Sequence, residues 1–127
     1  RGLGDVYKRQ EYSLELIRHE ISQHRKNCAA QRKLEAQFRR DGDTMPSHLT
    51  ERLSLLKEKN AMVAGWLSLL SEDEEYVVRR HVLDGVTWTR IELEYNERWK
   101  EFGKTSRTLM RYYKHALEII QAFANAE

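Results

Sequence analysis

Residues Lys104 to Phe123 read KTSRTLMRYYKHALEIIQAF, and this stretch predicts a helix with two chemically different faces. Thr105 and Ser106 suit the N-cap, because a short side-chain oxygen accepts a hydrogen bond from the free N–H groups of a first helical turn. Apolar side chains recur at three- and four-residue steps and form one stripe: Leu109, Tyr113, Ala116, Leu117, Ile120, Phe123 and Ala124. The opposite face carries cations, a hydroxyl and an imidazole: Arg107, Thr108, Arg111, Lys114 and His115.

Two interpretations fit this helix. Its apolar stripe can pack on a domain while its cationic face lies in the major groove of DNA. Alternatively, it is a surface helix whose basic face is simply solvated. The charge of the neighbouring segments favours a polyanionic partner, because residues 71–97 contain three basic and eight acidic residues, whereas residues 98–115 contain six basic residues and one acidic residue.

The composition indicates a helical protein. The chain has 127 residues, which is enough for one domain or for a small domain with a helical extension. Charged residues make up 33% and there is a single proline, so we expect helices and not disorder. The one cysteine, Cys28, excludes an internal disulfide bond and fits a reducing compartment. No apolar run is long enough for a membrane span, so we expect a cytoplasmic protein with no membrane partner.

The N-terminal segment stands apart from the rest of the sequence. Residues 1–10 read RGLGDVYKRQ and have neither helical nor strand periodicity. They resemble the translated remains of a sequencing adaptor, so we expect residues 1–9 to be non-native or disordered, and a true start to be missing. The predicted fold therefore begins at residue 10.

The N-terminal half predicts an antiparallel helical hairpin over residues 10–70. Gln10 to Arg40 consists almost entirely of good helix formers, and one helix of this length would span roughly 45 Å. A connection rich in short polar residues follows at positions 41–47, and a second helix begins at Ser47 or Thr50. Its apolar seam is cleaner than that of the first helix. Spare apolar surface on such a hairpin favours a homodimer, with simple packing of the two helices as the alternative.

The C-terminal half, residues 71–127, predicts three further helices. Ser71 and Glu74 have the spacing of a capping box, and the acidic residues of that first turn suit the positive end of the helix dipole. Asp84 and Gly85 end this helix in a tight turn, and Thr87 caps the next. The order is helix, tight turn, helix, longer turn and basic helix, which is typical of a tri-helical helix-turn-helix domain. The expected fold is therefore all-α, a long N-terminal helical hairpin followed by this domain.

These residues also resemble a known family. The run LSLLSEDEEYVVRRHVLDGVTWTRIELEYN, followed by TSRTLMRYYKHALEII, is similar to the helix-turn-helix of sigma-factor region four. It looks closest to the phage-encoded transcriptional regulators of the ArpU and RinA kind. The shared features are a cap, a Gly-x-x-Trp-x-x-Ile turn and a Ser-Arg-Thr-Leu helix start, and they lie within residues 67–123: Leu70, Ser71, Glu74, Gly85, Trp88, Ile91, Ser106 to Leu109, Ala116 and Leu117.

The resemblance implies a DNA-binding regulator of phage or prophage transcription, with Ser106 to His115 in the major groove of double-stranded DNA. RNA polymerase or another protein is a further candidate partner. Carried over by position, Arg107, Thr108, Arg111, and Lys114 or His115 face bases or nearby phosphates, and Thr87 and Arg90 meet the DNA backbone. Lys104, Ser106 and Tyr112, whose ring can stack on bases, complete the expected DNA-binding residues. This chain departs from the family between Tyr95 and Lys104, where a compact motif needs only a few residues. Either the supporting helix runs on by two turns, or an inserted loop lies beside the groove.

The sequence indicates neither an enzyme nor a cofactor. There is no Gly-rich phosphate loop and no nucleophile elbow. His19 and His24 are five residues apart and do not share a helix face, whereas His24 and Cys28 do share one but have no third or fourth ligand. We therefore expect no catalytic residues and no metal site.

The alternative function is a protein-interaction module on a helix-turn-helix scaffold. Examples are a phage-encoded inhibitor of a host defence nuclease, of the anti-CRISPR kind, and a packaging adaptor. The near-zero net charge, the long hairpin and the enlarged linker favour it.

Overall fold

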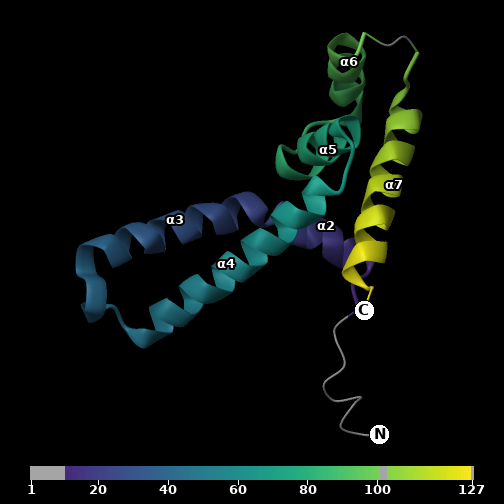
Figure 1. Cartoon of the computed structure of the whole chain (residues 1–127). Coiled ribbons are helices and arrows are strands. Elements are labelled where there is room, and N and C mark those ends of the chain that lie inside the picture. The colour runs from purple at the N-terminus through teal and green to yellow at the C-terminus, as the bar shows by residue number, and fades with distance from the viewer. Residues whose placement is uncertain (1–10, 101–102, 127) are drawn as a thin grey trace, which may run out of the picture.

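The computed structural model describes residues 11–100 and 103–126, and their regular structure is entirely helical (Figure 1). The predicted all-α fold class is confirmed. None of the helices in these two ranges is long and apolar enough to cross a membrane. The elements in chain order are α2 (Leu14–Ser22), α3 (His24–Asp41), the 3₁₀ turn η1 (Gly42–Thr44), α4 (Ser47–Ser68), α5 (Glu72–Val78), the π-helical turn η2 (Arg79–Leu83), α6 (Trp88–Arg98) and α7 (Ser106–Ala124).

The expectation of one helix from Gln10 to Arg40 is wrong, because two helices cover this stretch. The Ser13 side chain caps α2 by accepting from the Leu16 N–H, and the chain breaks at Gln23 before α3 begins. Burial explains the break. Ile17 and Ile21 are fully buried in a core with α7, whereas α3 packs along α4. A single straight helix cannot follow both partners.

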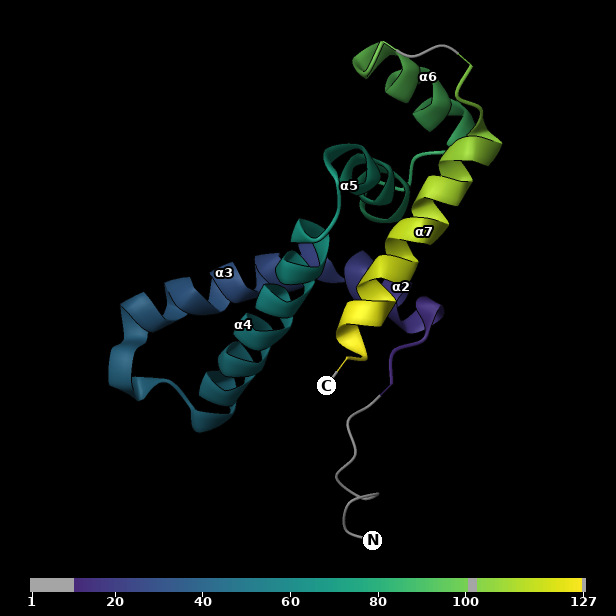
Figure 2. The same cartoon turned by 45° about the vertical axis from the view of Figure 1, so that its right-hand side comes forward.

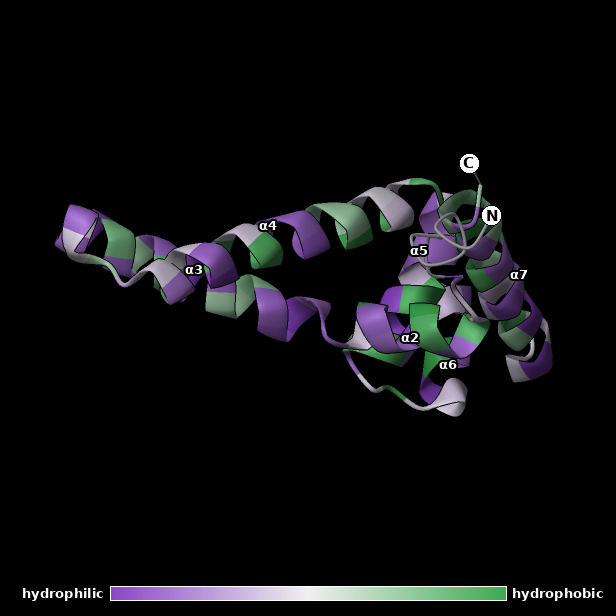
Figure 3. Ribbon diagram, turned by 90° about the horizontal axis from the view of Figure 1, so that it is seen from below, coloured by the Kyte–Doolittle hydropathy of each residue, from purple (hydrophilic) through white to green (hydrophobic). Residues whose placement is uncertain are grey.

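α3 and α4 lie side by side and are joined by η1, Met45 and Pro46 (Figure 2). α4 begins at Ser47, as predicted. A small apolar cluster of Leu34, Met45, Leu53 and Leu56 holds their far ends together. Nearer the other helices, the buried Asn60 donates to the Asn27 carbonyl at 3.2 Å and to Gln31 Oε1 at 2.7 Å. The pair forms an elongated arm that projects from the remaining helices (Figure 3).

The main core lies at the base of this arm. Its buried residues come from α2, α4, Leu70, α5 and α7: Ile17, Ile21, Val63, Trp66, Leu67, Leu70, Val78, Ala116, Leu117, Ile120 and Ala124. This core joins residues from both sides of the domain boundary that we predict at residue 70. Residues on both sides of position 70 therefore share one buried surface.

A second core joins α5, α6 and α7. Val77, Ile91, Tyr95 and Leu109 are buried there, with aromatic rings around them. The predicted local signals hold: Ser71 and Glu74 form a capping box, Thr87 caps α6, and Gly85 turns the chain at a φ of +65° that favours glycine. A π-helical turn follows α5 and carries His81, which stacks on Trp88 at 4.3 Å between ring centroids.

α7 buries most of its predicted stripe. Leu109, Ala116, Leu117, Ile120 and Ala124 are buried, and Tyr113 is half-buried. The assignment of Phe123 to this stripe is wrong, because its side chain is 58% exposed. Ala124 is the last residue of α7 in the main core. Phe123 lies about 100° around the helix axis from Ala124, so its side chain points away from this core.

Candidate nucleic-acid interface

The start of α7 is fixed to α6 through Ser106. Thr105 is the N-cap and accepts from the Thr108 N–H at 3.2 Å. Ser106 donates to Glu92 Oε1 twice, from its N–H at 2.6 Å and from its hydroxyl at 2.8 Å. Its hydroxyl also lies 3.3 Å from the Trp88 carbonyl oxygen. Ser106 is one of the residues expected to face DNA, but its N–H and hydroxyl form hydrogen bonds within the protein. It therefore positions the start of the helix.

Three cations of α7 face solvent. Arg107, Arg111 and Lys114 are exposed and lie on one face, at spacings of four and three residues. Within residues 11–100 and 103–126, none of the three forms an ion pair with a carboxylate. Arg111 Nη2 makes a 3.4 Å contact with Thr108 Oγ1 on its own helix. The acidic residues of α5 and α6 therefore leave this face open.

His115 marks the edge of this face. Its Nδ1 lies 2.9 Å from Glu74 Oε2, so the α7 imidazole joins the capping box of α5. Burial by itself would raise the pKa of the Glu74 carboxyl, but hydrogen bonds from His115 and Ser71 outweigh burial and the pKa lies below its usual value. His115 remains 65% exposed, so it keeps one side toward solvent.

Lys104 and Tyr112 are half-buried beside the open face. The Lys104 ammonium lies 5.8 Å from the centroid of the Tyr112 ring, and the Lys104 carbonyl accepts from Asn96 Nδ2 at 3.0 Å. Tyr112 meets Tyr95 edge-on at 6.2 Å between centroids. Both residues pack against the α6 side of the domain, so they lie at the margin of the exposed cations.

Thr87 and Arg90 begin α6 at the surface. Thr87 Oγ1 accepts from the Arg90 N–H at 3.4 Å, so the threonine acts as the N-cap. Arg90 Nε lies 3.1 Å from Glu94 Oε2, with the arginine side chain 71% exposed. Arg90 is thus accessible but already paired with one carboxylate.

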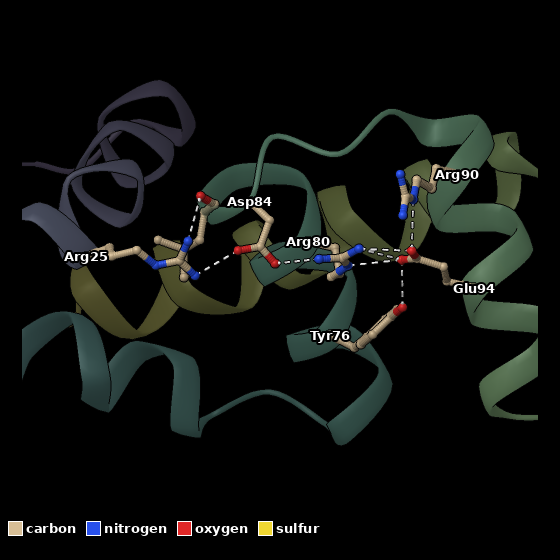
Figure 4. A network of polar contacts seen from close by, with 7 residues as sticks. Arg25, Tyr76, Arg80, Asp84, Arg90 and Glu94 are labelled. Atoms are coloured by element: carbon tan, nitrogen blue, oxygen red, sulfur yellow. Dashed lines mark hydrogen bonds and ion pairs between the residues drawn. The ribbon is translucent and has the colours of Figure 1, made fainter.

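A chain of ion pairs connects α3 of the arm to η2, Asp84 and α6 (Figure 4). Arg25 of α3 contacts Asp84 Oδ1 at 2.7 Å, and the other Asp84 oxygen contacts Arg80 Nη1 at 2.9 Å. Arg80 also grips Glu94 with Nη2 contacts of 2.8 and 2.9 Å. Tyr76 and Arg90 complete the set by donating to Glu94 at 3.1 Å each.

These contacts shift the pKa values of the groups involved. The hydrogen bonds from Arg80 lower the pKa of Glu94. Glu94 and Asp84, which accept these bonds from Arg80, in turn raise the pKa of the arginine. Burial would raise the pKa of Asp84, but its bonds from Arg25 and Arg80 outweigh this. Apart from Arg90, which the resemblance assigns to the DNA backbone, the residues of this group are not predicted from the sequence. The four-residue spacings of Arg80 with Asp84 and of Arg90 with Glu94 are visible in the sequence, but the links between elements are not.

Of the two predicted alternatives for the linker, the extension of the supporting helix by two turns is wrong, and the inserted loop beside the groove stays a prediction. α6 continues only to Arg98, which is less than one turn past Tyr95, and not by two turns. Trp99 stacks on Tyr95 at 4.8 Å between centroids, with the Arg98 guanidinium 4.9 Å from the Trp99 ring. The first linker residues therefore pack on the domain. Phe102 lies outside the described residues.

His24 and Cys28 lie close together in the arm. Cys28 Sγ is 3.7 Å from His24 Nε2, and burial followed by the charge of Arg79 lowers the pKa of His24. In the part of the chain that the structure describes, no third histidine, cysteine or acidic residue joins them as a metal-binding group.

No protein-family model matches this chain, and neither the curated proteins nor the solved structures contain a match.

Proposed function

We propose that this protein is a DNA-binding transcriptional regulator of the phage or prophage type, with a helix-turn-helix formed by α5, α6 and α7. The observation that carries the proposal is the open cationic face of Arg107, Arg111 and Lys114. Positive side chains that no carboxylate neutralises, on a helix fixed firmly from behind, are what a duplex-binding helix requires.

The dimensions of this face suit a major groove. An α-helix with its side chains is about 10–12 Å across, and Arg107 to Lys114 extend over about 10.5 Å of its axis. The major groove of B-DNA is about 12 Å wide and admits one helix. Met110 lies between the cations and is 42% exposed, so it can contact a thymine methyl group. In this arrangement Arg107 and Arg111 read base edges, and Lys114 and the start of α6 contact phosphates.

Selection of bound sequences from a random duplex pool, at two salt concentrations, tests the proposal. We expect enrichment of a defined site and a steep loss of affinity as salt rises, because phosphate contacts release counterions. A two-fold repeated site would also indicate a homodimer. A pool that stays random at both salt concentrations would count against the regulator.

The second candidate function is binding of another protein, such as RNA polymerase, a host nuclease or a packaging component. Two exposed leucines favour it, Leu55 on α4 at 66% and Leu93 on α6 at 68%. Leu55 lies on the arm, so it is also a candidate contact for a homodimer. Removal of residues 10–69 would strip Ile17, Ile21 and Trp66 from the core. The sharper test is therefore Leu55→Lys or Leu93→Lys, which should abolish partner capture and leave duplex binding unchanged.

A further inference from the structure

The exposed face of α3 carries a regular array of positive charge. Its six cations form three adjacent pairs at seven-residue intervals: Arg25 with Lys26, Arg32 with Lys33, and Arg39 with Arg40. All six are exposed. Only Arg25 has an ion-pair partner, Asp84, among residues 11–100 and 103–126. One of the two acids of α3, Glu35, accepts from Gln31 on the side of the helix that packs on α4.

Helical geometry arranges these cations in two rows. Seven residues return to nearly the same side of a helix after about 10.5 Å. The first row is therefore Arg25, Arg32 and Arg39, and the second is Lys26, Lys33 and Arg40. The rows lie about 100° apart around the axis, on the side opposite Leu34, which is buried against α4. Between the rows the helix presents only Ala29 and Ala36.

We propose that this face of α3, the α3 cationic face, is a second DNA-binding surface that grips duplex phosphates without reading sequence. The two rows of cations are separated by small alanine side chains. Each row can contact the phosphates of one of the two strands that border a groove of the duplex. Alanine has no polar side-chain atom, so nothing between the rows can recognise a base edge. The inference extends the proposed function, because α3 lies on the arm that projects away from α7 (Figures 1 and 3). It would bind a stretch of duplex distinct from the one that α7 reads.

An anionic membrane surface is the competing polyanion. A helix that lies in a lipid interface inserts large apolar side chains beside its cations. The large apolar residues of α3, Leu34 and Phe38, instead pack in the cluster with α4. The charged face therefore has nothing to insert, which favours a rigid duplex over a bilayer.

The test compares two variants with the same change of charge in the full chain. One is Arg32→Gln with Lys33→Gln on α3, and its matched control is Arg52→Gln with Lys57→Gln, at exposed positions of α4. Fluorescence anisotropy measures the affinity for a random-sequence duplex over a range of salt concentrations. We expect the α3 variant to flatten the slope of log affinity against log salt by about 1.8, since each lost phosphate contact removes about 0.9. The control should keep the wild-type slope.

Further variants and controls distinguish the possible outcomes. The charge-preserving variant Arg32→Lys with Lys33→Arg should retain the wild-type slope, and circular dichroism should show equal helicity in all variants. Equal slopes for the α3 variant and its control, with the wild type bound, would overturn the α3 surface and leave the proposed function of α7 intact. Loss of affinity in the α3 variant alone, with Arg107→Ala and Arg111→Ala unaffected, would support the α3 surface and overturn the role of α7. Sedimentation of the wild type with phosphatidylserine vesicles, but no duplex binding, would overturn both.

Discussion

Titratable side chains whose pKa values are shifted in the folded protein make its stability depend on pH. The carboxyl groups of Asp73, Glu74, Asp84 and Glu94 all have lowered pKa values. Only hydrogen bonds and nearby positive charge do this, because burial acts in the opposite direction. Burial and nearby arginines lower the pKa values of two histidines as well, His24 and His81. In both sets the folded protein binds fewer protons than the unfolded chain does at acidic pH.

This difference predicts acid-labile stability in two stages. As the pH falls below about 6.5, the histidines of the unfolded chain bind protons before the histidines of the folded protein do. Below about 4.5 the same holds for the carboxylates. The free energy of unfolding therefore decreases in both ranges. Urea denaturation at constant ionic strength between pH 7 and pH 3 measures it. His81→Phe keeps a ring against Trp88 and should reduce the loss between pH 7 and pH 5. Stability that is constant or rises as the solution is acidified would contradict the assignment.

At the scale of elements, the ion pairs at Arg80 join η2 to α6. The Arg80 side chain is 27% exposed and grips Glu94 with two nitrogens, whereas that of Arg25 is 66% exposed and meets Asp84 from α3. We expect Arg80→Met to lower the free energy of unfolding by about 1–3 kcal/mol, because it removes three hydrogen bonds to the partly buried Glu94 carboxylate and leaves it with only Tyr76 and Arg90. Arg25→Met should cost less than about 1 kcal/mol, as exposed pairs do. Chemical denaturation measures the free energy of unfolding of both variants. Equal decreases in Arg80→Met and Arg25→Met would contradict the prediction.

The two faces of α7 provide a second comparison. Ile120 is fully buried in the main core, and Phe123 is 58% exposed on the same helix. We expect Ile120→Ala to cost about 2–5 kcal/mol and Phe123→Ala less than about 0.5 kcal/mol. Thermal or urea unfolding of the two variants measures the contrast. A large loss from Phe123→Ala would show that this side chain is covered in solution, for example by a second copy of the chain.

The elements that sequence predicts well are those with local causes. Ser71, Thr87 and Thr105 each cap the helix that follows, because a cap depends only on residues within one turn. The break at Gln23 has no local signal, since Gln10 to Arg40 consists of good helix formers and only the burial of Ile17 and Ile21 with α7 separates α2 from α3. The role of Ser106 was missed for the same reason. Its partner Glu92 is fourteen positions away, and a serine at a helix start predicts a cap or a ligand contact equally well.

For the whole molecule, one arm and one compact group of helices carry two separate cationic surfaces. The compact group fixes α7 from behind through its two cores and leaves Arg107, Arg111 and Lys114 open. The arm carries the α3 cationic face and is tied to the group by Arg25 and Asp84. A formal net charge of +2 therefore conceals two local concentrations of positive charge, which is why the total charge predicts little about binding.

The central claim is that the open face of α7 reads duplex DNA. The most direct measurement is the ratio of affinities for a selected site and for a scrambled duplex, in the wild type, in Arg111→Ala and in the control Lys57→Ala on α4. We predict that Arg111→Ala loses about 1–3 kcal/mol of binding free energy for the selected site and far less for the scrambled duplex, and hence most of its specificity. Lys57→Ala should keep the wild-type ratio of affinities. An unchanged ratio in Arg111→Ala, and likewise in Arg107→Ala, would contradict the claim.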